Sequence, residues 1–256
     1  MNHVTLKLEE TDALFVKDIL IFEQEHVTGN TVLPFFADGF PGLVFHKSRD
    51  GQWVQPQNKK MPAGYLYGQT LHPIELHING PYKIILVQLY PFVLNSFFGI
   101  NTEEMNNECF DLIKLPAWAA IEPDLLASED TTRQTQIILT FLRNLFASTK
   151  EQLDNLIMEA LQIILNNNAQ ITVTELSNKL HVTLRTFERR FVKAVGISAK
   201  EFIQISRFHQ SFGQLTKKQY SRISDIVYAN GYSDQSHFIR VFKAFTGKTP
   251  RHFQLL

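Results

Sequence analysis

Short apolar stretches separated by turn residues dominate the first hundred positions of the chain. The stretch Ile74–Ile78 alternates apolar and polar residues with a period of two, which is typical of a half-buried strand. Asp38-Gly39 and Pro41-Gly42 are turn signals between two further apolar stretches. We predict four more strands, at Thr31–Phe36, Leu43–His46, Tyr65–Tyr67 and Lys83–Tyr90. Evenly spaced short strands of this kind favour a small sandwich or open barrel.

Helical periodicity replaces this alternation farther along the chain. Pro91 is expected to open a short helix that Gly99 ends. After about residue 128, apolar positions recur at helical spacing, first over 131–147 and then over 153–165. We expect residues 148–152 to cap the second of these helices. The pattern predicts an α+β fold of two domains, a β-rich domain with a trailing helix over 1–150 and an all-α domain over 151–256.

The segment Ile171–Val195 has the pattern helix, tight turn, helix. Thr172 and Glu175 form a capping box, in which each side chain satisfies a free amide at the start of a helix. After a turn at His181-Val182, Thr183 can cap a second helix that Gly196 ends. The inner face of this helix is Leu184, Phe187, Phe191 and Val195, and its outer face is Arg185, Glu188, Arg189 and Arg190. A helix with a basic exposed face, seated on another by a short turn, is typical of a helix-turn-helix unit.

The same pattern recurs near the C-terminus. Ile223, Ile226 and Val227 face inward from a short helix, and Gly231 supplies a turn conformation that other residues resist. Ser233 or Asp234 caps the next helix, which Gly247 ends. Its inner face is Phe238, Val241, Phe242 and Phe245, and its outer face is Gln235, Ser236, His237, Arg240 and Lys243. A connecting helix with its own capping box, Ser198 and Glu201, joins the two units.

Charge supports a nucleic-acid role for the second half. The net charge of zero conceals two opposite parts. Residues 1–165 hold 11 basic and 20 acidic side chains, whereas residues 166–256 hold 14 basic and 5 acidic ones. A basic segment on an acidic body is typical of a nucleic-acid-binding module. The longest apolar runs fall far short of the roughly 20 residues of a membrane span. One cysteine excludes an internal disulfide and a cysteine-built zinc site. The N-terminal stretch carries acids and lacks the basic start and apolar core of a signal peptide. We therefore expect a cytoplasmic protein without a cofactor.

The run from Ile223 to Pro250 resembles the C-terminal signature of the AraC/XylS family of bacterial transcription regulators. The matching positions are Ala229, Gly231, Tyr232, Ser236, Phe238, Phe242, Lys243, Gly247, Thr249 and Pro250. The resemblance extends over 152–256 and includes Gly196-Ile-Ser198 and Arg207. Two positions depart from the family pattern. Ala199 replaces the usual proline, and Arg222 replaces the usual small capping hydroxyl, so the cap is expected to shift to Ser221.

The resemblance implies roles for the outer faces of both recognition helices. Arg185, Glu188 and Arg189 correspond to base-facing positions of the first helix, and Gln235, Ser236, His237 and Arg240 line the matching face of the second. Arginine can donate twice to guanine, and glutamate can accept from cytosine. Glu188 has an alternative role, which is to pair with Arg185 or Arg189. The remaining basic side chains are interpreted as phosphate contacts: Arg190, Lys193, Lys200, Lys243, Lys248 and Arg251.

The first half resembles the family's sensor domains more loosely, through Phe36–Phe45, Gly68-Gln69 and Pro91. This similarity implies an incomplete cupin-like barrel. The implied function is a sequence-specific regulator of transcription that binds double-stranded DNA in successive major grooves. A small-molecule effector, a second copy of the chain and RNA polymerase are the further partners that the resemblance implies.

Two alternatives remain open at the level of sequence. A metal-dependent cupin-type enzyme fused to a DNA-binding module is the alternative function, with His72, Glu75 and His77 as the candidate ligands. Strand geometry argues against this set, because His72 should point away from the face that Glu75 and His77 share. The apolar stripe Ile137, Phe141, Leu142 and Leu145 either covers the barrel or forms a dimer seam.

Overall fold

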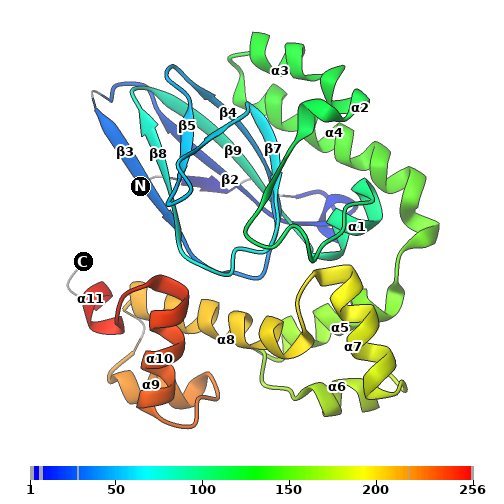
Figure 1. Ribbon diagram of the computed structural model, residues 1–256, viewed down its shortest axis with the longest axis vertical. Helices are drawn as coiled ribbons and strands as arrows, with labels where there is room; N and C mark the ends of the chain where they lie inside the picture. Colours follow the sequence, from blue (N-terminus) through cyan, green and yellow to red (C-terminus); the bar gives the residue numbers. More distant parts are fainter. Residues whose placement is uncertain (1–2, 6–7, 28, 219, 255–256) are drawn as a thin grey trace.

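The computed structural model describes residues 3–5, 8–27, 29–218 and 220–254. Two antiparallel sheets with flanking helices form one half of the molecule, and a group of helices forms the other (Figure 1). The long helix α8 (Ala199–Thr216) runs beneath the sheets, with α9–α11 at one end and α5–α7 at the other. The predicted α+β fold of two parts is confirmed.

The β-rich half is built from a six-stranded and a four-stranded sheet. The larger sheet has the order β1 (His3–Thr5), β2 (Val16–Gln24), β9 (Tyr82–Leu89), β4 (Gly42–Ser48), β7 (Gly64–Tyr67) and β10 (Cys109–Asp111). The smaller sheet has the order β3 (Asn30–Phe35), β8 (Ile74–Asn79), β5 (Gln52–Gln55) and β6 (Lys59–Met61). The five predicted strands correspond to β3, β4, β7, β8 and β9 and are confirmed. Sequence reasoning missed β2, although it pairs with β9 along almost its whole length.

Alternation along the strands divides the apolar side chains between two cores. On β4, Val44 faces the interior between the sheets, while Leu43 and Phe45 face the helices on the outside of the larger sheet. The outer core requires a glycine on β7. A Cβ on Gly64 would lie 2.4 Å from Cζ2 of the fully buried Trp118, so no larger residue fits at position 64.

Four helices accompany the larger sheet: α1 (Phe92–Phe98), α2 (Pro116–Ala119), α3 (Glu122–Ala127) and α4 (Thr131–Thr149). The predicted stop at Gly99 is confirmed, since this residue ends α1 with a φ of +64°. On α4, Phe141 and Leu142 are buried, and the Phe141 ring meets the Trp118 ring edge-on at 5.3 Å. This part of the apolar stripe therefore covers the sheet. Ile137 and Leu145 stay half-buried beside it.

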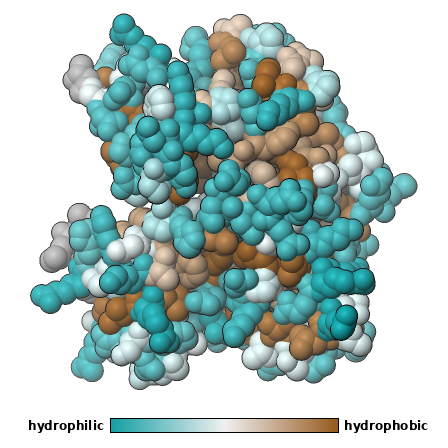
Figure 2. All heavy atoms as spheres, viewed as in Figure 1, coloured by the Kyte–Doolittle hydropathy of each residue, from teal (hydrophilic) through white to brown (hydrophobic). Residues whose placement is uncertain are grey.

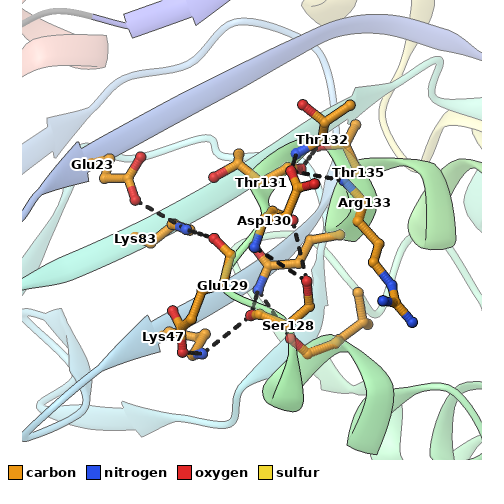
Figure 3. Close-up of polar contacts among 12 residues, drawn as sticks. Glu23, Lys47, Lys83, Ser128, Glu129, Asp130, Thr131, Thr132, Arg133 and Thr135 are labelled. Atoms are coloured by element: carbon orange, nitrogen blue, oxygen red, sulfur yellow. Dashed lines mark hydrogen bonds and ion pairs between the residues drawn. The ribbon is translucent and has the colours of Figure 1, made fainter.

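Two lysines of the larger sheet form hydrogen bonds and an ion pair with the residues just before α4 (Figure 3). Lys47 on β4 donates to the main-chain oxygens of Leu126 and Ser128 and pairs with the Glu129 carboxylate. Lys83 on β9 donates to the main-chain oxygen of Glu129 at 2.7 Å. The connection between α3 and α4 is thereby held by charge-assisted hydrogen bonds, which are stronger than neutral ones.

The helical half contains α5 (Asn155–Asn166), α6 (Val173–Lys179), α7 (Leu184–Val195), α8, α9 (Ile223–Ala229), α10 (Gln235–Thr246) and α11 (Pro250–Gln254). Both predicted capping boxes, at Thr172 and at Ser198, are confirmed. The boundary near residue 150 stays a prediction, and in the structure Lys150 begins a 3-10 turn between α4 and α5.

Two predicted caps were wrong. The side chain that caps α5 is Asp154, which accepts from the amide of Ile157, and not a residue of 148–152. The start of α9 does not move to Ser221. It stays at Arg222, whose amide donates to the Asp225 carboxylate at 2.7 Å, while the amide of Asp225 donates to the main-chain oxygen of Arg222 at 2.9 Å.

Candidate nucleic-acid interface

The first helix-turn-helix unit consists of α6 and α7. Thr183 caps α7 by accepting from the amide of Thr186, and Gly196 ends it with a φ of +88°. Phe187 and Phe191 are fully buried, which confirms their predicted place in the core. The opposite side of α7 exposes Arg185, Arg189 and Lys193, four residues apart and therefore on one face.

The second unit, α9 and α10, repeats this construction. Asp234 caps α10 through the amide of His237, and this hydrogen bond holds the pKa of the carboxyl below its ordinary value. Gly247 ends the helix with a φ of +72°. Phe238 and Phe242 are fully buried, whereas Phe245 is only half-buried. The exposed face carries Gln235, Ser236, Arg240 and Lys243.

His237 is the most constrained residue of the second face. Its ring is half-buried, its Nδ1 lies 3.2 Å from the Ser233 hydroxyl, and it meets the Tyr232 ring edge-on. Tyr232 is itself buried, which raises its pKa to about 12. The imidazole is therefore held at the start of α10, with its orientation set by two neighbours.

Glu188 and Arg190, like His237, have partners within the protein. Oε2 of Glu188 lies 3.4 Å from the amide of Ala199, at the start of α8. A proline at 199 would have no amide hydrogen to donate. Neither Arg185 nor Arg189 forms an ion pair with Glu188 in the described part of the chain. Glu188 is thus turned toward α8.

Arg190 forms a bidentate ion pair with Asp154 instead of pointing away from the protein. Its Nε and Nη2 lie 2.9 and 2.5 Å from the two carboxylate oxygens, and this bonding raises its pKa. The guanidinium predicted to contact phosphate therefore joins α7 to the start of α5. The other predicted phosphate contacts are exposed: Lys193, Lys200, Lys243, Lys248 and Arg251.

Sequence reasoning missed two exposed aliphatic side chains on the recognition helices. Leu184 at the start of α7 is 47% exposed, and Ile239 on α10 is 36% exposed. Each lies beside predicted base-facing residues. Helical spacing predicted that Leu184 faces inward, and this prediction was wrong. Only its exposure in the structure identifies Leu184 as a candidate contact.

The β-rich half contacts the end of the first recognition helix, which the sequence did not indicate. The Thr102 hydroxyl donates to the main-chain oxygen of Lys193 at 2.9 Å. The Asn106 side chain donates to the main-chain oxygen of Gly196 at 2.7 Å. Gly196 is packed so closely that a Cβ at this position would lie 2.5 Å from the main-chain oxygen of Thr102. The two halves therefore meet at the end of α7.

Aromatic packing continues this junction toward the second unit. Phe36 lies 5.2 Å from the Phe212 ring on α8 and 5.7 Å from the Phe253 ring on α11. Figure 2 shows hydrophobic side chains in the band where the two halves meet. The β-rich half thus touches α7 of the first unit, the connecting helix α8 and the helix α11 that follows the second unit.

The candidate metal ligands do not come together. Nε2 of His77 lies 3.0 Å from the Glu75 carboxylate, whereas His72 lies outside strand β8 and is exposed. No cluster of three or more His, Cys, Asp or Glu that could hold a metal occurs among the described residues. Within the same residues, no helix has the length and apolarity needed to cross a membrane.

Comparison with known families identifies the helical half. Residues 176–255 match the helix-turn-helix domain family, and residues 13–111 match a domain family of unknown function. Within the helical half, residues 176–255 form an AraC/XylS-type helix-turn-helix domain. The match begins at Leu176 in α6, so the AraC/XylS-type domain includes both units and the connecting helix α8.

Relatives of the AraC/XylS-type domain occur in longer proteins. It is 32% identical over 89 residues to AdaA of Bacillus subtilis, a bifunctional transcriptional activator and DNA repair enzyme, covering 35% of this chain and 42% of AdaA. It is 27% identical over 92 residues to an HTH-type transcriptional regulator of Staphylococcus aureus strain MSSA476, covering 36% of this chain and 12% of that protein. The chain therefore spans less than half the length of these relatives.

The comparison with solved structures also returns two matches of low identity. ToxT from Vibrio cholerae O395 has 12% identity over 93% of this chain and 96% of ToxT, with a TM-score of 0.49. The DNA-binding domain of AdpA, solved in complex with a target DNA, has 21% identity over 39% of this chain and 89% of that domain, with a TM-score of 0.37.

Proposed function

We propose that this chain is a sequence-specific DNA-binding regulator of transcription that places α7 and α10 in successive major grooves of double-stranded DNA. One observation carries the proposal. The chain builds two helix-turn-helix units on a single connecting helix, and each presents an exposed polar face opposite its buried phenylalanines. Recognition helices of this kind read base edges in the major groove, and successive grooves lie about 34 Å apart.

The two exposed faces support a division of roles. Arg185 and Arg189 on α7 and Arg240 on α10 are free to donate to guanine. Leu184 and Ile239 can contact the methyl group of thymine, the apolar feature of the major groove. Lys193, Lys200, Lys243, Lys248 and Arg251 are assigned to phosphates, which position the protein without specifying sequence. Glu188 and Arg190 are assigned to holding α7 in place.

The β-rich half is proposed to modulate DNA binding through the end of α7, where Thr102 and Asn106 bond to it. Either a small-molecule effector or a second copy of the chain could bias this contact, provided that it binds two states with different affinity. A cupin-type enzyme has less support, because no group of three His, Cys, Asp or Glu that could hold a metal occurs among the described residues.

In vitro selection of random duplex DNA by the full-length protein tests the proposal. The expected result is a two-part motif whose halves are about one helical turn apart. Failure of the folded full-length chain and of residues 152–256 alone to enrich any motif would contradict the proposal. Enrichment by the shorter piece alone would instead show that the β-rich half restrains DNA binding.

A further inference from the structure

The loop between α5 and α6, residues 167–172, lies against the second helix-turn-helix unit. The side-chain amide of Gln170 donates to the main-chain oxygen of Ala229 at 2.6 Å. Ala229 is the last residue of α9, and carbonyl groups at the end of a helix have no partner within the helix. A residue just before the first unit thus satisfies a free carbonyl of the second.

Arg207 on α8 makes a second link between the same two regions. Its Nε donates to the main-chain oxygen of Ala169 at 2.7 Å. Its guanidinium also lies near the turn of the second unit. Cζ is 3.7 Å from where a Cβ on Gly231 would lie, and the Arg207 charge acts on the Tyr232 hydroxyl, whose pKa it lowers against the larger effect of burial. Arg207 therefore bonds to the loop before α6 and lies beside the turn before α10.

The backbone of this loop is held in an uncommon shape. Asn168 and Ala169 have φ values of +52° and +54°, a region that residues other than glycine rarely adopt. Ala169 is fully buried, and its amide bonds to the oxygen of Ile164 at 2.8 Å. This conformation presents the Ala169 oxygen to Arg207, and it persists because the surrounding contacts determine it.

From these contacts we propose that Gln170 and Arg207 fix the separation of the two recognition helices and so set the spacing between DNA half-sites that the protein accepts. Within the helical half, these two residues add direct links to the connection that α8 provides. Adding one base pair between half-sites moves them apart by about 3.4 Å and rotates one about the DNA axis by about 35°. A pair of recognition helices held at several points cannot follow that change, whereas a pair held at fewer points can follow part of it.

The inference rests on the proposed function, and its test begins with the motif that the full-length wild-type protein selects. Duplexes carry that motif with zero, one or two base pairs inserted or removed between its halves. Binding is measured for the full-length wild type, Gln170→Ala, Arg207→Lys and the double variant. Arg207→Lys keeps the positive charge but loses the planar fork that reaches two partners. Gln162→Ala is the matched control, because Gln162 is an exposed glutamine on α5.

We expect wild type and Gln162→Ala to lose about tenfold or more in affinity for each base pair of altered spacing. The double variant should lose about threefold or less in affinity for each base pair of altered spacing, and each single variant should lie between these values. Base preferences within each half-site should stay as in wild type, because no base-facing residue changes. A change confined to stability would lower binding at every spacing by the same factor, which thermal unfolding of each variant would reveal.

The outcomes separate the inference from the function on which it rests. A double variant as strict in spacing as wild type overturns the inference, and so does a wild type that accepts altered spacing without loss. Selection of no motif, or of a single half-site, by the wild type contradicts the proposed function itself.

Discussion

The side-chain amide of Asn106 donates to the main-chain oxygen of Gly196 at 2.7 Å, and so joins the β-rich half to the end of a recognition helix. The bond crosses 90 positions of sequence. It is accompanied by the Thr102 hydroxyl, which donates to Lys193. The conformation of α7 and the docking of the two halves are therefore linked.

Asn106→Asp should weaken this docking. A carboxylate cannot donate, and it would face the carbonyl oxygen of Gly196, so a loss of about 1–3 kcal/mol in unfolding free energy is expected. Limited proteolysis near residues 150–154 should become faster, and the thermal midpoint should fall. Asn144→Asp, at an exposed position on α4, is the control. Equal behaviour of the two variants would contradict the role given to Asn106.

Gly196→Ala and Gly247→Ala form a matched pair at the ends of the two recognition helices. Both glycines have positive φ, so alanine is strained at either position by about 1 kcal/mol or more. Only at 196 would the new Cβ also meet the main chain of Thr102, at 2.5 Å, whereas at 247 the nearest atom is 3.8 Å away. Calorimetry should therefore show the larger loss of stability for Gly196→Ala. Similar losses of stability in the two variants would mean that the Thr102 main chain shifts readily to make room for the new methyl group.

Arg189→Ala should weaken binding to the selected site by about 1–3 kcal/mol and relax the preference at one base pair. Lys243→Ala should instead weaken binding to all sequences and lower the slope of log affinity against log salt by about one. Titrations of both variants at several salt concentrations check these expectations. A uniform loss across sequences for Arg189→Ala would show that this side chain contacts only phosphate.

Asp154→Ala should destabilise the protein more than Arg190→Ala does. Asp154 both pairs with Arg190 and caps α5 through Ile157, and a lost cap costs about 0.5–2 kcal/mol. Arg190→Ala removes only the ion pair, whose side chains are 37% and 31% exposed, and partly exposed pairs contribute about 0–1 kcal/mol. Denaturant unfolding measures both. Since both variants lose the ion pair, an arginine variant that is the less stable would contradict the role given to the Asp154 cap.

Asp38→Asn should change how stability depends on pH. Burial raises the pKa of Asp38 from 3.8 to about 7, although Gln88 and the amide of Phe40 donate to its carboxylate. Because the folded-state pKa is the higher one, the contribution of Asp38 to stability is greatest below about pH 4 and is lost as pH rises through about 7. Asparagine stays neutral, so the variant should gain stability relative to wild type over that range.

The Asp38 comparison is made between thermal midpoints at about pH 5 and about pH 8. Wild type alone does not isolate the effect, because burial lowers the pKa of His46 to about 4 and this shift acts in the opposite direction. The difference between variant and wild type does isolate it. A difference that is the same at both pH values would show that Asp38 does not titrate in this range.

Local patterns were sufficient to predict much of the helical half. A capping box such as Thr172 with Glu175 needs partners only three residues apart, and Gly196 and Gly247 supply a positive φ that their own backbone allows. Phe187 and Phe191 are four residues apart, so a single helix places both on one buried side. The two helix-turn-helix units followed from such short-range chemistry.

Only the tertiary structure decided which groups meet across long stretches of chain. Nothing near Arg190 in the sequence indicates that its partner is Asp154, 36 positions away, or that Glu188 turns toward α8. The strand β2 escaped prediction because a register shift between Val16 and Asp18 interrupts its alternation of buried and exposed positions. The sequence by itself determined the two recognition helices, the glycines that end them and the side that carries their buried phenylalanines, since these depend on neighbours within one or two turns. The junction at Gly196 and the link from Gln170 to Ala229 depend on packing between distant segments, which no local pattern encodes.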